Sequence, residues 1–71
     1  MADYALFSRG QIWTLHCSLG WVRGYSTRTD ALEAMTLALK GDPSAAAARL
    51  LLQDETGLVT SPPPHAFLQP G

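Results

Sequence analysis

The sequence predicts a single α+β domain, with an antiparallel sheet in βββαββ order and one amphipathic helix packed on one face. Three observations support this fold class. Up to residue 25, short apolar runs alternate with glycine-containing turns, which is typical of an antiparallel meander. The apolar period then changes from two to 3.6 residues, as in an amphipathic helix. Finally, two short apolar runs flank a turn at residues 54–57, which predicts a second hairpin.

The meander is expected to contain three strands, at residues 4–7, 12–17 and 21–25. Gly10 lies in the first turn, where it is free to take a positive φ. Successive side chains of a strand point to opposite faces, so Trp13, Leu15 and Cys17 share one face. This set is more apolar than the alternate set, and we therefore expect it to face the core.

The helix is predicted from an apolar stripe that ends before Gly41, a usual C-terminal residue. Thr27, Thr29 and Asp30 offer side-chain oxygens for the N-cap, and Glu33 follows Asp30 at the spacing of a capping box. The residues of the stripe are Ala31, Leu32, Met35, Ala38 and Leu39.

The second half is expected to begin with a short helical turn after Asp42 and Pro43. A strand at residues 49–53 and another at 58–60 then form the hairpin, with Asp54 at the first position of a type I turn. Three consecutive prolines follow, and they favour an extended polyproline II segment. The predicted organisation is therefore one domain at residues 1–60 and an extended Pro-rich tail at residues 61–71.

Length and composition limit the possible functions. The 71 residues include one cysteine, so an intrachain disulfide is excluded. Small domains often gain stability from disulfides, a metal or a second subunit. A disulfide is excluded and no zinc-type spacing of Cys and His is present, so a second subunit remains, and we expect a homodimer. The sequence has neither a secretory pattern nor the about 20 apolar residues of a membrane span. A cytoplasmic protein without a membrane partner is therefore expected.

Charge is low and unevenly placed. The formal net charge is −1, with three arginines against one aspartate in residues 1–29 and two cations against five acidic residues in residues 30–71. A non-specific nucleic-acid binder is usually basic overall, which this chain is not. The arginines of residues 1–29 are still compatible with a locally basic face, whereas the low total charge of the chain favours association with protein.

No pattern indicates catalytic, cofactor-binding or metal-binding residues. The chain has no glycine-rich phosphate loop, no nucleophile elbow and no zinc-type spacing of Cys and His. His16 and Cys17 are adjacent in a strand and point to opposite faces, which is unsuitable for a catalytic Cys–His couple. Asp54 is explained by its turn. We therefore expect a protein that is not an enzyme and uses no cofactor.

Trp21, Arg23 and Tyr25 alternate along the third strand and share one face, with Arg28 just beyond it. Aromatic side chains on a sheet can stack on bases and arginine can bind phosphate, so these residues are a candidate nucleic-acid surface. The same residue types are enriched at protein-interface hot spots. In a third interpretation Trp21 and Tyr25 lie under the helix, with Arg23 at the rim. Of the two binding interpretations, we favour the protein interface.

Three segments, at residues 20–22, 29–34 and 50–59, resemble a family of small uncharacterised bacterial proteins. That family shows a G-W-x-V strand, a T-x-x-E-A helix start and a D-x-x-G-x-I hairpin. The resemblance covers residues 11–60 and implies the α+β fold but no activity. Residues 24–33 are also similar to HicB-type antitoxin domains, which run β-β-β-α-β, although the Pro-Asp-Leu-Pro-Gly type of segment is missing here.

Taken together, these features predict a small, non-enzymatic, bacterial protein-interaction or regulatory module that acts as a homodimer and binds another protein. The alternative is a nucleic-acid-binding module that uses Trp21, Arg23, Tyr25 and Arg28.

Overall fold

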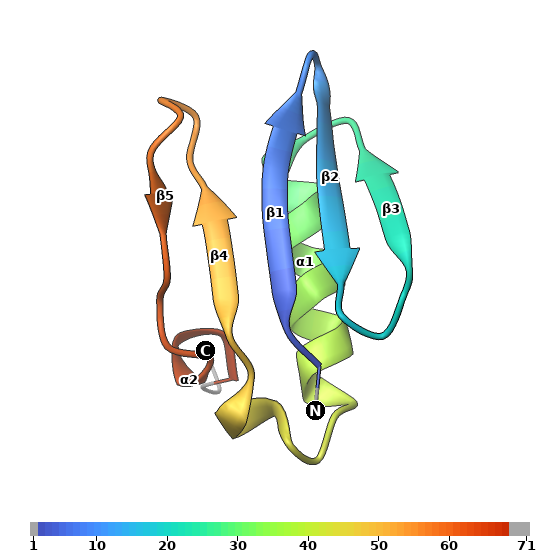
Figure 1. Cartoon of the computed structure of the whole chain (residues 1–71), viewed down its shortest axis with the longest axis vertical. Helices are drawn as coiled ribbons and strands as arrows, with labels where there is room; N and C mark the ends of the chain where they lie inside the picture. The colour runs from blue at the N-terminus through green and yellow to red at the C-terminus, as the bar shows by residue number, and fades with distance from the viewer. Residues whose placement is uncertain (1, 69–71) are drawn as a thin grey trace.

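A computed structural model describes residues 2–68, which contain five strands and two α-helices (Figure 1). The strands are β1 (Tyr4–Arg9), β2 (Ile12–Cys17), β3 (Val22–Tyr25), β4 (Leu50–Gln53) and β5 (Val59–Thr60). The helices are α1 (Arg28–Lys40) and α2 (His65–Leu68), and a 3-10 turn at Ala45–Ala47 precedes β4. The α+β class is confirmed, and α2 is an addition to the predicted βββαββ order.

The sheet is mixed, with the strand order β3-β2-β1-β4-β5. The β1–β2, β2–β3 and β4–β5 pairs are antiparallel as predicted, but β4 lies parallel to β1. The prediction of a wholly antiparallel sheet is therefore wrong. The reason is the path of α1, which returns the chain along the sheet to the end where β1 starts (Figure 1). β4 then enters beside β1 in the same direction.

The core lies between the sheet and α1, which is behind the sheet in Figure 1. Leu6 pairs with Leu15, and Tyr4 with Cys17, so the buried side chains of β1 and β2 point to the same face. As predicted, Leu15 and Cys17 face the core, whereas Trp13 is half-buried at its border. The other buried residues are Ala2, Ala31, Met35, Leu39, Ala45, Ala48, Leu50 and Leu52.

Thr27 caps α1, because its Oγ1 accepts a hydrogen bond of 3.1 Å from the backbone N–H of Asp30. Asp30 therefore lies inside the first turn, where a carboxylate is favourable beside the helix dipole. Because Thr27 and not Asp30 is the N-cap, the expected capping box of Asp30 and Glu33 is not formed. The helix ends at Lys40, followed by Gly41, and its buried residues belong to the predicted stripe.

The β4–β5 turn has the predicted form. The N–H of Gly57 donates to the backbone oxygen of Asp54 at 3.1 Å, and Gly57 has a φ of +95°. The Asp54 carboxylate accepts hydrogen bonds from the Thr56 hydroxyl (2.6 Å), the Thr56 N–H (2.8 Å) and the Leu58 N–H (3.0 Å). The bond from the Thr56 hydroxyl is the main cause that lowers the pKa of Asp54.

The Pro-rich tail differs from its prediction. Residues 61–63 have no regular structure, but His65–Leu68 form a helical turn, so the expected extended conformation does not hold there. Phe67 and Leu68 are half-buried against the core, and their apolar area favours docking over a free extended segment. The last part of the predicted tail, residues 69–71, lies outside the described residues.

Candidate functional site

The strand register places Trp21, Arg23 and Tyr25 on the core side of the sheet. Tyr25 pairs with Trp13 and Arg23 with Leu15, so their side chains share the face that α1 covers. Trp21 and Tyr25 are half-buried against the core, and Arg23 is exposed at the rim. This is the third of the arrangements considered from the sequence. With Ala34, Leu37 and Ala38 of α1, they line a hollow of about 390 Å³, the β3–α1 groove.

The aromatic surface of this groove is already occupied. The Arg23 guanidinium carbon lies 5.1 Å from the centre of the Trp21 ring, within the range of a cation–π contact. The Tyr4 ring packs against the same indole, with the ring centres 6.1 Å apart. A nucleobase can stack on the face beneath Arg23 only by displacing this guanidinium.

Arg28 does not join the other three candidate residues. It begins α1, and its Nε donates a hydrogen bond of 2.9 Å to the backbone oxygen of Gln53, where β4 ends. Its guanidinium carbon lies 6.0 Å from the centre of the Trp13 ring. Arg28 thus connects the start of the helix to the sheet, which is a structural task.

Sequence reasoning missed the opposite side of the sheet, which we call the open face. Four large apolar side chains on it are well exposed: Ile12 (47%), Val22 (57%), Leu51 (47%) and Val59 (44%). No helix of residues 2–68 covers this side, which faces the viewer in Figure 1. By the register it also carries Ala5, Phe7, Arg9, Thr14, His16, Gly24 and Gln53.

A signal for the open face was present in the sequence. Residues 50–52 are three consecutive leucines, and alternation must place Leu51 opposite its two neighbours. Strands that are apolar on both sides are typical of sheets buried on both faces. Gly24 lies close to the exposed Ile12 side chain, which an added Cβ at Gly24 would meet at 3.1 Å. Without a side chain at Gly24, Ile12 can lie over β3.

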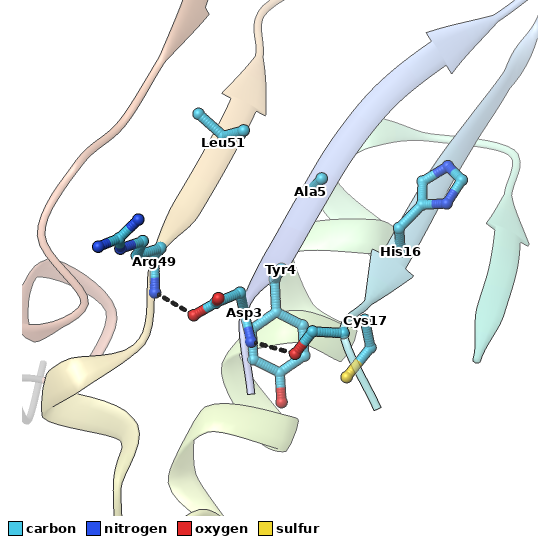
Figure 2. A pocket seen from close by; sticks show the side chains of 8 residues that line it. Asp3, Tyr4, Ala5, His16, Cys17, Arg49 and Leu51 are labelled. Atoms are coloured by element: carbon cyan, nitrogen blue, oxygen red, sulfur yellow. Dashed lines mark hydrogen bonds between the residues drawn. The ribbon is translucent and has the colours of Figure 1, made fainter. Parts of the chain in front are cut away.

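The centre of the open face is hollowed around Ala5. His16 on β2 and Leu51 on β4 flank this small side chain (Figure 2). The resulting Ala5 hollow has a volume of about 310 Å³. Its complete lining is Asp3, Tyr4, Ala5, His16, Cys17, Ser18, Arg49 and Leu51.

Polar groups at one end of the Ala5 hollow hold the backbone in place. The Asp3 carboxylate accepts a hydrogen bond of 2.9 Å from the N–H of Arg49, and the Asp3 N–H donates to the Ser18 hydroxyl at 2.8 Å (Figure 2). These bonds fix the start of β1 to the start of β4 and to the end of β2. They also hold the Asp3 carboxylate at the rim of the open face.

His16 and Cys17 point to opposite sides of β2, as the sequence predicts. His16 is exposed at the Ala5 hollow, whereas Cys17 is buried beside Tyr4. Burial is the main cause that raises the pKa of Tyr4, and the nearby Cys17 thiol adds to it. Tyr4 is therefore a neutral core residue at physiological pH.

Among residues 2–68, no three His, Cys, Asp or Glu side chains come together in a group that could hold a metal ion. None of the helices in this part of the chain is long and apolar enough to cross a membrane. Comparisons with protein-family models, with curated proteins and with solved structures find no match for the chain. The resemblances noted from the sequence therefore stay predictions.

Proposed function

We propose that the chain is a non-enzymatic interaction module that binds protein through the open face of its sheet. The observation that carries this proposal is the exposure of Ile12, Val22, Leu51 and Val59 on the same face of the sheet. A sheet that is covered on one side normally turns polar side chains to water on the other, and large apolar patches on soluble proteins mark interaction sites. A regulatory or adaptor role fits a module that offers a surface instead of a reaction centre.

The edges of the sheet are less suited to binding than its face. β5 has only two residues, and prolines at positions 62–64, which lack an N–H, follow it closely. Short edge strands and prolines are common protections against pairing with another strand. β3, at the other edge, contains an exposed glycine and an exposed arginine. The apolar area of the open face is therefore the stronger basis for association.

A Leu51→Glu substitution tests the proposal. Leu51 is half exposed, so the new carboxylate reaches water in the free chain, but a bound partner would bury it without a counter-charge. Leu58→Glu is the matched control, because Leu58 is 61% exposed and lies outside the open face. Self-association should be measured by sedimentation, and capture of other proteins with each chain as bait. We expect Leu51→Glu alone to abolish the association seen with the wild type.

The proposal fails if the Leu51→Glu chain keeps every association of the wild type, or if the wild type binds nothing in either assay. Circular dichroism of both variants verifies that they fold. An equal loss of association in Leu51→Glu and Leu58→Glu would indicate non-specific hydrophobic association, and would also contradict a binding face.

The β3–α1 groove supports a second candidate function, binding of single-stranded nucleic acid by Trp21, Arg23 and Tyr25. Its lining brings two aromatic side chains and a cation into one hollow. The test is a titration of tryptophan fluorescence with short oligonucleotides at low and moderate salt. Saturable quenching that weakens with salt and disappears in Arg23→Glu supports this function. Unchanged fluorescence at micromolar oligonucleotide rejects it.

A further inference from the structure

We propose that the partner of the open face is a second copy of this chain, packed face to face with its central strand reversed. This inference rests on the proposed function, because it specifies the occupant of the same surface. Three observations carry it: the residue order along β1, the charges at its two ends, and the area of the face.

The central strand of the sheet is self-complementary in size. On the open face β1 carries Ala5, which is small and lies in a hollow, and Phe7, which is large and half-buried. They stand one residue before and one residue after Leu6. A two-fold axis that crosses the strands at Leu6 therefore places Phe7 of each copy over the Ala5 hollow of the other. The hollow of about 310 Å³ has room for an aromatic ring.

The same axis makes the charges complementary. Asp3 and Arg9 have the same alternation as Ala5 and Phe7, and they lie three residues before and three residues after Leu6. Reversal of the second strand brings Asp3 of one copy to Arg9 of the other, at both ends of the interface. An arrangement with parallel central strands would instead place like charges together, which is unfavourable. Between these two charged positions, the paired strands carry no acidic side chain, lysine or arginine on the open face. Arg49, whose N–H donates to the Asp3 carboxylate, is a further cation at the Asp3 end, where it lines the Ala5 hollow.

The available area suits a small dimer. The sheet spreads over the broadest side of the molecule, whose Cα extents are 33 × 25 Å (Figure 1). These extents include the turns beyond the sheet, so an ellipse with these axes sets an upper limit of about 650 Å² before side chains are added, below the about 800 Å² per partner of a standard interface. Two such sheets would pack about 10 Å apart with their strands near −30°, which long side chains such as Arg9 can span.

The size relation is tested with Ala5→Phe and Phe7→Ala, each in the full chain. Ala5→Phe sets ring against ring, and Phe7→Ala leaves both hollows empty. We expect each variant to weaken the dimer about 10- to 100-fold in sedimentation equilibrium, because overpacking and cavities each have a large cost. A mixture of the two variants should form a mixed dimer of nearly wild-type affinity, because each ring then faces a hollow.

The orientation is tested with Arg9→Lys and a carbodiimide, which joins a carboxylate directly to an amine. Asp3 and position 9 of one chain are about 20 Å apart along the strand, so a link between them must join two chains. We expect a covalent dimer in which peptide mapping finds Asp3 bound to the lysine introduced at position 9. A dimer without this link overturns the reversed orientation.

A wild-type chain that stays monomeric at millimolar concentration overturns the inference, as does a mixture of Ala5→Phe and Phe7→Ala that does not re-associate. Failure here is distinguishable from failure of the proposed function. A monomeric chain that still binds another protein, and loses it in Leu51→Glu, keeps the proposed function and loses only the second copy as the partner.

Discussion

The role of Arg28 differs between the prediction and the structure, and a substitution at this position tests the difference directly. From the sequence Arg28 belongs to a binding surface with Trp21, whereas its Nε lies 2.9 Å from the backbone oxygen of Gln53 and closes the junction of α1 and β4. Arg28→Ala removes this bond and the contact of the guanidinium with Trp13. The change should therefore lower stability and leave protein binding intact.

The size of the effect follows from the two contacts. A hydrogen bond from a charged group contributes about 1.5–3 kcal/mol, and a partly exposed cation–π pair about 0.5 kcal/mol. Because Arg28 is only half-buried, we expect a total near the lower end, about 2 kcal/mol. A domain of this length loses about 4–8 °C in Tm per kcal/mol, so Tm should fall by about 8–16 °C.

Urea unfolding followed by circular dichroism measures this loss without dependence on the fluorescence of Trp13. Arg9→Ala is the matched control, because Arg9 is an exposed arginine at the end of β1. It should change the free energy of unfolding by less than about 0.5 kcal/mol, measured at a concentration where the chain is monomeric. Equal stability of the two variants would refute the structural role of Arg28.

Three further predictions concern stability. Leu15→Ala should cost about 3 kcal/mol in urea unfolding, because Leu15 is fully buried between the sheet and α1, and a loss below about 1 kcal/mol would contradict this packing. Thr27→Ala should lower the free energy of unfolding by about 1 kcal/mol, while the exposed Thr29→Ala should leave it nearly unchanged; equal losses would argue against Thr27 as the cap. Asp54→Ala should destabilise the chain at neutral pH by removing the turn bonds. The pKa of Asp54 is lower in the folded chain than its unfolded value of about 3.9. The Asp54 carboxylate therefore stabilises the fold above a pH of about 3.9, and this stabilisation is lost as pH falls through the pKa of the folded state. The unfolding curves of the wild type and of Asp54→Ala should therefore converge in acid.

Local signals were sufficient for most of the elements. The change of period from two to 3.6, the glycine at the end of α1 and the Asp–Gly turn each depend on residues within a few positions, and the structure confirms them. The choice of Thr27 as the cap among three candidates was open, because all three side chains can accept the same bond. Only the position of the first helical turn, fixed by the packing of Ala31 and Met35, selects one.

By itself, the sequence determined the α+β class, the approximate positions of the strands and of α1, and the core face of β2, because alternation and turn chemistry are local properties. It placed the end of β1 too early, since that strand continues through Ser8 and Arg9. Tertiary structure decided what depends on partners distant in the chain. It decided that β4 pairs parallel to β1, that Phe67 and Leu68 pack against the core, and that Arg28 donates a hydrogen bond to Gln53 at the end of β4. It also decided which side of the sheet remains uncovered. One helix can cover only one face, and the path of α1 selects it, so the apolar residues of the other face remain in contact with water.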